Sequence, residues 1–168
     1  ECLLAHNVKN SKLESELIIS TVLQCKRIDL YIKYYDKKLK NIQFTKCHDY
    51  LERRIAGEPI QYILENAPFY GRNFLVNNNV LIPRFDSELM IDTLKQSSCF
   101  DNLLEIGTGS GNLAITISME NIANNIIATD ISKKKIDIAK YNKNKLCPNS
   151  KIKFIIDDFL NSKINNKF

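Results

Sequence analysis

The segment Glu105-Ile106-Gly107-Thr108-Gly109-Ser110-Gly111 decides the fold, because it joins an apolar run to an amphipathic one. The run Leu103-Leu104-Glu105-Ile106 predicts a short buried strand, and Leu113 and Ile117 predict the helix that follows. Glycines between a strand and a helix let the backbone turn tightly and approach a ligand beside the helix N-terminus. The segment therefore predicts a ligand-binding loop.

The residues after the loop repeat the alternation of strand and helix. A second strand ends at Asp130, Ser132 caps the next helix, and Lys151–Ile156 forms a third strand. Strands that alternate with helices of this length predict an α/β fold with a parallel sheet and crossover helices. Three strands do not complete such a fold, so we expect a sheet that is truncated at Phe168.

An acidic residue in the second strand strengthens the prediction of a ligand site. Asp130 lies about 20 positions beyond the loop, where an acid can accept hydrogen bonds from both ribose hydroxyls of a nucleotide-like cofactor. In the alternative interpretation the glycines only make a tight turn and Asp130 caps the next helix. A third cue is Asp158-Phe159, which follows the last strand. The aromatic ring could face an adenine and the carboxylate accept its amino hydrogens, or Phe159 could be ordinary core.

The spacing of the glycines indicates which cofactor fits. A dinucleotide-binding loop needs a third glycine at position 112, which is Asn112. Glu105 would repel a phosphate group but suits the cationic sulfonium and amino group of S-adenosylmethionine. Spacing and charge together favour a methyltransferase over a dehydrogenase.

The chain before this region reads as two helices and a hairpin. Apolar spacing predicts a helix over residues 13–23, and Thr45 is a candidate N-cap for a second helix that stops near Gly57. Arg53, Arg54 and Glu58 read as its solvated end. Residues 69–82 combine strand-forming residues with turn signals at Gly71 and at Asn77-Asn78-Asn79, which indicates a hairpin that links two domains. Asp86 or Ser87 can then cap a further helix.

Composition excludes several classes of protein. Lys and Arg number 24 against 19 Asp and Glu, and the excess is spread along the chain instead of clustering as a nucleic-acid footprint. No apolar run approaches the roughly 18–20 residues of a membrane-spanning helix, and no signal peptide is visible. The five cysteines and two histidines lack zinc-site spacing, so we expect reduced thiols, no metal and a cytoplasmic protein.

Several motifs in order resemble the N5-glutamine methyltransferases that modify peptide chain release factors. They are Gly57-Glu58-Pro59-Ile60, the hairpin, Leu81-Ile82-Pro83-Arg84-Phe85-Asp86-Ser87-Glu88 and the glycine loop. The likeness covers nearly the whole chain, is weakest before residue 45, and draws most of its specificity from the Leu-Ile-Pro-Arg block. The family usually has proline at the position of Phe85, a departure that concerns only the local backbone.

The resemblance implies a Rossmann-like class I methyltransferase domain that uses S-adenosylmethionine. We expect a helical domain that helps to recognise the release factor at residues 1–65, a β-hairpin linker at 66–84 and an incomplete methyltransferase domain at 85–168. Arg84 would lie close to the cofactor, without an assigned role. The implied cofactor-binding residues are Gly107, Thr108, Gly109, Ser110, Gly111, Asp130, Asp158 and Phe159.

The catalytic motif of that family, Asn-Pro-Pro-Tyr, does not occur in this sequence, so no catalytic residue is predicted. Family members carry it at the end of the fourth strand, where it orients the glutamine amide nitrogen. We therefore expect an inactive, truncated fragment that binds S-adenosylmethionine weakly or not at all and transfers no methyl group. We also expect a monomer whose partner is a release factor, with no nucleic-acid or membrane partner.

Four alternatives stay open at this point. The nearest is the sister activity on a glutamine of a large-subunit ribosomal protein, and the second is a methyltransferase acting on amino groups of nucleic-acid bases. A non-catalytic nucleotide-binding or interaction module and an NAD-dependent oxidoreductase are the others.

Overall fold

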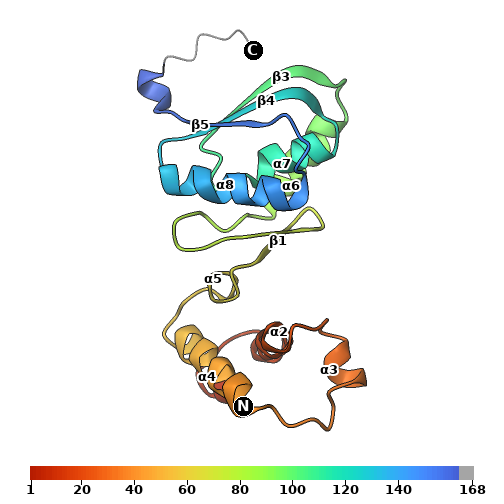
Figure 1. Cartoon of the computed structure of the whole chain (residues 1–168), viewed down its shortest axis with the longest axis vertical. Helices are drawn as coiled ribbons and strands as arrows, with labels where there is room; N and C mark the ends of the chain where they lie inside the picture. Colours follow the sequence, from red (N-terminus) through yellow and green to blue (C-terminus); the bar gives the residue numbers. More distant parts are fainter. Residues whose placement is uncertain (163–168) are drawn as a thin grey trace. The chain divides into compact units, whose positions relative to one another are not determined.

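The computed structural model describes residues 1–162, in two compact units that divide between Leu64 and Glu65. The first unit is helical, with a core of Leu3, Ile18 and Cys47. Its helices are α1 Cys2–Ala5, α2 Ser11–Leu23, α3 Asp29–Ile32, α4 Asn41–Ile55 and α5 Ile60–Ile63 (Figure 1).

Helix α2 confirms the predicted helix over residues 13–23, but the second helix begins earlier than predicted. Helix α4 starts at Asn41, and Thr45 lies inside it instead of capping it. The Thr45 hydroxyl donates to the Asn41 carbonyl at 3.1 Å, the backbone bond that a serine or threonine inside a helix often makes. The backbone N–H of Lys40 donates instead to the Gln43 side chain at 2.9 Å. The helix ends at Ile55, and Gly57 follows with a φ of +94°, as its predicted stop requires.

Arg54 corrects the prediction of a merely solvated helix end. Its Nε atom lies 2.6 Å from Oε2 of Glu14 on α2, and Glu14 is only 8% exposed. Arg53 pairs with Glu58 at 2.7 Å. The carboxylate that holds Arg54 lies 40 positions upstream, beyond the reach of any local pattern.

The second unit contains a hairpin followed by an α/β sheet. Its elements are β1 Ala67–Phe69, β2 Arg72–Phe74, α6 Asp86–Lys95, β3 Phe100–Ile106, α7 Asn112–Met119, β4 Ala123–Asp130, α8 Lys133–Leu146, β5 Lys153–Ile156 and the 3-10 turn η1 Phe159–Asn161. Strands β3, β4 and β5 pair in this order and are all parallel, which confirms the predicted sheet with crossover helices.

The hairpin turns at Tyr70 and Gly71, which both have positive φ, of 47° and 71°. Two such residues are typical of the tight turn that matches the twist of paired strands. The rings of Phe69 and Phe74 lie edge to face at 6.1 Å, and both are buried in the same core as the α/β sheet. The strands end at Phe74, so residues 75–82 carry no strand. Helix α6 follows and begins at Asp86, with Phe85 at the N-cap position. Neither Asp86 nor Ser87, the two predicted caps, makes a side-chain bond that caps the helix.

The helices of this unit cover one face of the sheet, as Figure 1 shows for α6, α7 and α8. Successive right-handed crossovers that advance in one direction along a sheet place their helices on the same face. The first strand is therefore less buried than predicted: Leu103, Leu104 and Glu105 are half-buried, and Ile106, at its carboxyl end, is 50% exposed. Ile156, at the end of the edge strand β5, is 52% exposed, although it alternates onto the same face as Phe154.

Candidate functional site

The loop between β3 and α7 is bent by three glycines in the left-handed region. The φ angles are 77° at Gly107, 56° at Gly109 and 79° at Gly111, values that favour glycine. The backbone N–H groups of Gly107 and Thr108 both donate to the carbonyl of Thr129 at 2.8 Å. The N–H of Gly109 donates to the Asp130 carboxylate at 3.1 Å. Most backbone N–H groups of the loop therefore donate to residues of β4 and do not point outward.

The two polar side chains of the loop are buried and support it from within. Thr108 is 2% exposed and Ser110 is 1% exposed. The Thr108 hydroxyl donates to Glu105 at 3.0 Å, and the Ser110 hydroxyl donates to Asn112 at 3.0 Å. These two predicted site residues therefore support the loop and present almost no surface of their own to a ligand.

The open side of the loop lies at Gly107 and Gly109. A Cβ atom added at either glycine would meet nothing within 4 Å, so a ligand can lie directly against the backbone there. At Gly111 a Cβ would lie 3.0 Å from Cβ of Ala139 on α8. The first two glycines therefore leave room for a ligand, and the third lets α8 pack against the loop.

The carboxylate of Glu105 occupies the N-terminus of α7. Its Oε2 atom accepts from the backbone N–H of Ala114 at 3.0 Å as well as from Thr108. The positive end of a helix dipole favours an anion at this position, where dinucleotide-binding folds hold the pyrophosphate. Here the anion is part of the protein: the N–H of Ala114 donates to Glu105, and the N–H of Gly111 donates to the Thr108 carbonyl at 2.8 Å. The loop is therefore poorly suited to a phosphate, in agreement with the predicted preference for a cation.

Burial raises the pKa of Glu105 from its ordinary 4.5 to about 7, and the neighbouring charge of Asp130 adds to the increase. Between pH 4.5 and about pH 7 the unfolded chain has lost the Glu105 proton that the folded chain keeps. The free energy of unfolding therefore falls as pH rises through this range. We expect Glu105→Gln to be more stable than the parent by roughly 2–3 kcal/mol at pH 8 and equally stable near pH 4. Urea unfolding at both pH values measures this difference. An advantage of Glu105→Gln that is the same at both values would contradict the assignment.

Asp130 lies where the sequence predicts it, at the end of β4 and beside the loop. It is 4% exposed, and its two oxygens accept from the N–H groups of Gly109 and, at 3.0 Å, of Ser132. Nζ of Lys135 lies 3.6 Å away. The alternative in which Asp130 caps the next helix differs from this bond, because Ser132 precedes the first residue of α8, Lys133. Asp130 thus shapes the loop and also provides negative charge at the edge of the sheet.

Asp158 and Phe159 follow β5 at the same edge. The backbone N–H of Asp157 donates to the Asp130 carbonyl at 3.1 Å, which joins the ends of β4 and β5. Phe159 is 55% exposed and so is not ordinary core. The Asp158 carboxylate caps η1, accepting from Leu160 at 3.3 Å and from Asn161 at 2.8 Å. The ring is available to a flat ligand, whereas the carboxylate already has two partners.

Asn142 on α8 is a site residue that sequence reasoning missed. It is fully buried and uses its whole amide: Oδ1 accepts from the N–H of Leu75 at 2.7 Å, and Nδ2 donates to the carbonyls of Leu75 at 3.0 Å and Ser110 at 2.9 Å. One side chain thus fixes both the segment after the hairpin and the glycine loop. We call these three residues, Leu75, Ser110 and Asn142, the asparagine clamp.

Residues 1–162 were also compared with the requirements of a membrane span, a disulfide and a metal site. No helix within residues 1–162 combines the length and apolar character needed to cross a membrane. All five cysteines are free, and no group of three or more His, Cys, Asp or Glu side chains in the same range is arranged to hold a metal ion.

Two domain families and several individual proteins match this chain. Residues 1–64 match a PrmC N-terminal domain, and residues 84–168 match a methyltransferase small domain. A release factor glutamine methyltransferase of Staphylococcus aureus is 41% identical over 152 residues, which cover 90% of this chain and 54% of that protein. One of Buchnera aphidicola is 35% identical over 162 residues, covering 95% and 58%. A bifunctional methyltransferase of Rickettsia bellii is 34% identical over 164 residues, covering 80% and 29%.

The chain spans little more than half the length of the two release factor glutamine methyltransferases. The matches confirm the resemblance that the sequence motifs indicated. They also confirm the predicted class of fold, because the methyltransferase small domain falls on the parallel sheet and its crossover helices. Because that domain accounts for just over half of its residues, the chain belongs to the methyltransferase small domain family.

Proposed function

We propose that this chain forms the donor-binding part of an S-adenosylmethionine-dependent methyltransferase that modifies the side-chain amide nitrogen (N5) of a glutamine in peptide chain release factors. The observation that carries the proposal is the Glu105 carboxylate at the N-terminus of α7, which places a protein carboxylate where a dinucleotide-binding fold holds the pyrophosphate. The names of the relatives supply the acceptor.

The residues of the loop fit the donor in shape and charge. The open backbone at Gly107 and Gly109 leaves space for a ligand, and the carboxylates of Glu105 and Asp130 suit a cation. When bound, S-adenosylmethionine supplies a methyl group activated by a sulfonium. In the proposed arrangement Asp130 holds the ribose, the exposed Phe159 ring stacks on the adenine, and Asp158 lies beside it. The buried side chains of Thr108 and Ser110 keep the loop in shape.

The acceptor chemistry requires positioning more than a strong base. A glutamine amide nitrogen is a poor nucleophile because its lone pair is delocalised into the carbonyl, so rate comes from orienting it toward the methyl group. Related enzymes use Asn-Pro-Pro-Tyr for this step, and residues 1–168 do not contain that motif. We therefore propose that the 168-residue chain binds the donor weakly, on its preformed loop, and transfers no methyl group.

Equilibrium dialysis with labelled S-adenosylmethionine tests the donor site. With a Glu105 pKa of about 7, the ionised fraction and hence the affinity should rise about tenfold from pH 6 to pH 8. Glu105→Gln should lower the affinity at pH 8 and flatten the pH dependence. NADH serves as the competing ligand, and retention of NADH without S-adenosylmethionine would reject the proposal in favour of an oxidoreductase.

Acceptor choice is tested separately with labelled donor and two purified proteins, a release factor and a large-subunit ribosomal protein. The 168-residue chain should label neither. The same chain extended by the remainder of a related enzyme, which carries Asn-Pro-Pro-Tyr, should label the release factor. Labelling of the ribosomal protein alone would transfer the activity to the alternative acceptor.

A further inference from the structure

The positive charge of the chain is concentrated in α8 and the residues that follow it. Residues 133–153 contain eight lysines and a single acidic residue, Asp137. Since the whole chain has a net charge of only +5, the rest of the chain is slightly acidic. The charge is therefore less evenly spread than the overall balance suggests, and a basic stripe along one helix is typical of a surface that attracts a polyanion.

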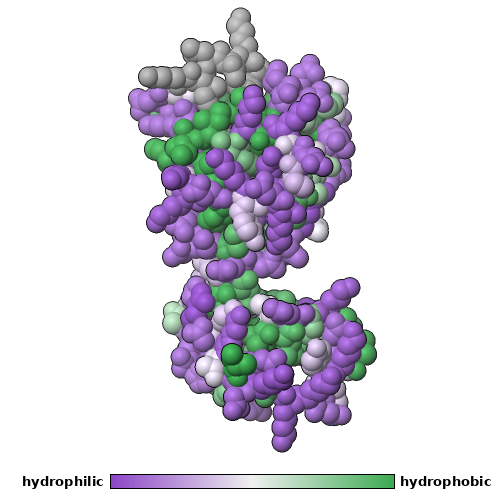
Figure 2. Space-filling view, in the orientation of Figure 1, coloured by the Kyte–Doolittle hydropathy of each residue, from purple (hydrophilic) through white to green (hydrophobic). Residues whose placement is uncertain are grey.

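The fold exposes the basic side of α8 and buries the apolar one. Ile136, Ile138 and Ala139 are buried within the unit. Figure 2 shows mainly hydrophilic side chains where α8 lies in Figure 1. We call the exposed lysines of this helix the lysine face: Lys133, Lys134, Lys140 and Lys145.

The lysine face is not neutralised by the protein itself. None of its four members forms an ion pair within residues 1–162. Asp137 is exposed on the same helix and also has no ion pair in that range. Lys135 does not belong to the face, because its Nζ lies 3.6 Å from Asp130 at the donor site. The face therefore keeps a net positive charge that is available to a partner.

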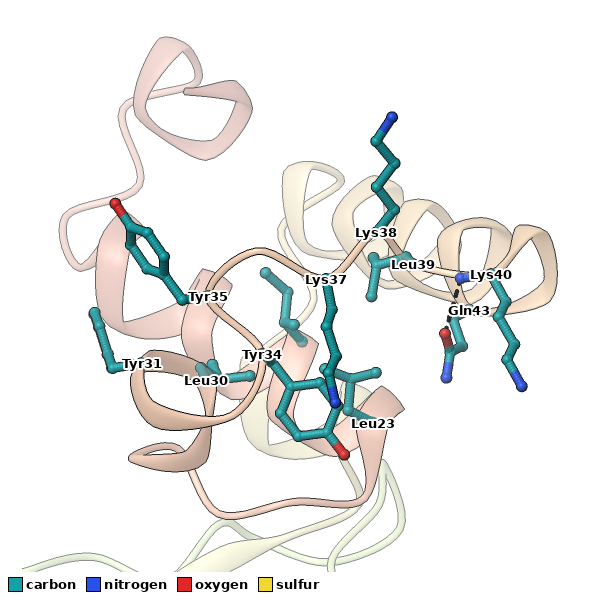
Figure 3. A pocket seen from close by; sticks show the side chains of 11 residues that line it. Leu23, Leu30, Tyr31, Tyr34, Tyr35, Lys37, Lys38, Leu39, Lys40 and Gln43 are labelled. Atoms are coloured by element: carbon teal, nitrogen blue, oxygen red, sulfur yellow. Dashed lines mark hydrogen bonds between the residues drawn. The ribbon is translucent and has the colours of Figure 1, made fainter.

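An aromatic ring lies among these lysines. Tyr141 is 54% exposed and directly follows Lys140. In the helical unit Nζ of Lys37 lies 4.9 Å from the centre of the Tyr34 ring, and Figure 3 shows these two side chains together. Across residues 1–162 no cation and no second ring packs on Tyr141 in this way. Its ring is therefore open to a flat partner.

Lysines beside an exposed aromatic ring suit a single strand of nucleic acid. The lysines bind phosphates with release of counterions, and an unpaired base stacks on the ring. A duplex keeps its bases stacked on one another and would leave Tyr141 unused. A bilayer would use the charge alone, because the apolar side of α8 is buried and cannot insert between lipids.

We infer that the lysine face and Tyr141 bind single-stranded RNA without regard to its sequence. The choice of RNA over DNA rests on the proposed function, since release factors act where RNA is translated. The inference departs from the expectation of no nucleic-acid partner, which considered the charge of the chain as a whole and not the surface of one helix.

The first experiment neutralises two lysines of the face in the 168-residue chain. Fluorescence anisotropy measures the binding of a labelled oligouridine of twelve nucleotides as the salt concentration rises. Lys140→Gln/Lys145→Gln should weaken binding more than about tenfold at 0.1 M salt. It should also lower the slope of log Kd against log salt by about 1.4, because each phosphate contact on a single strand contributes about 0.7.

Lys38→Gln/Lys40→Gln is the matched control, because it removes the same charge from the helical unit. Both lysines are exposed and have no ion pair within the described residues, and Figure 3 shows their side chains pointing in different directions. We expect this pair to weaken RNA binding less than twofold.

Tyr141 is tested by two substitutions that leave the charge unchanged. Tyr141→Ala should weaken binding at least about fivefold, as expected for the loss of one stacked base, and should not change the salt slope. Tyr141→Phe keeps the ring and should bind like the parent chain. An equal loss in Tyr141→Ala and Tyr141→Phe would show that the ring does not stack on a base.

Other results overturn the inference as a whole. These are no binding of the oligouridine by the parent chain at 0.1 M salt, equal losses in the two lysine pairs, tighter binding of the matching DNA, and binding only to vesicles of anionic lipid. Dialysis of the same samples with labelled S-adenosylmethionine keeps the two proposals apart. A chain that binds the donor but no RNA would refute the RNA surface alone, and a chain that binds RNA but no donor would contradict the proposed function.

Discussion

Asn142→Ala is expected to lower the free energy of unfolding by about 3–5 kcal/mol. The substitution leaves the N–H and C=O of Leu75 and the carbonyl of Ser110 without their partner in a region where Asn142 is fully buried. Each buried polar group that loses its hydrogen bond costs about 1–3 kcal/mol, and the three losses are not fully additive because one side chain makes all of them. Urea denaturation measures the total, and hydrogen exchange at the Leu75 amide reports the loss at the clamp itself.

Asn144 provides the matched control for this prediction. It lies on the same helix and is exposed, so Asn144→Ala should change stability by no more than about 0.5 kcal/mol. Asn142→Asp is a second probe, because it keeps the acceptor for the Leu75 N–H but turns a carboxylate oxygen toward two carbonyls. It should be at least as destabilising as alanine. Equal unfolding of the Asn142→Ala and Asn144→Ala chains would refute the clamp.

Gly111→Ala is expected to cost about 2–5 kcal/mol. The φ of 79° accounts for about 1–2 kcal/mol, since a side chain is strained in the left-handed region. The new Cβ would also lie 3.0 Å from Cβ and 3.2 Å from Cα of Ala139, and overpacking of this kind costs about 1–3 kcal/mol. Thermal and urea unfolding measure the loss.

Two further variants separate strain from steric overlap at Gly111. Ala139→Gly removes the Cβ that the new methyl group meets, so combining it with Gly111→Ala should recover about 1–2 kcal/mol in a double-mutant cycle. Gly109→Ala has the same kind of φ but no neighbour within 4 Å, so it should lose only about 1–2 kcal/mol. Additive costs for Gly111→Ala and Ala139→Gly would show that the helix does not pack on the loop in this way.

Local pattern was enough to predict the elements that surround the loop. The alternation of apolar runs with glycine and acidic residues depends on neighbours a few positions apart, and it correctly indicated α2, the hairpin, β4 and α8. The start of α4 was missed because Thr45 is as good a cap candidate as any nearby residue, while the side chain that meets the first turn belongs to Gln43.

Contacts between distant positions were beyond the reach of sequence reasoning. Asn142 reads as one polar residue of a mostly polar helix, and its partner Leu75 lies 67 positions away. Glu105 could be recognised as an acid before the loop, but its raised pKa depends on burial that only the packed sheet provides. The predicted site residues follow from local motifs at the ends of the strands, whereas the bonds that shape the loop follow from the fold.

The asparagine clamp also has a consequence for how the chain acquires its structure. Helices and hairpins form from contacts close in sequence and therefore quickly, but closing a link across 67 positions requires the whole intervening segment to be arranged first. The glycine loop thus reaches its final shape only after the hairpin and α8 have met. A chain emerging from the ribosome would complete its glycine loop as one of the last events of folding, well after the loop itself has been synthesised.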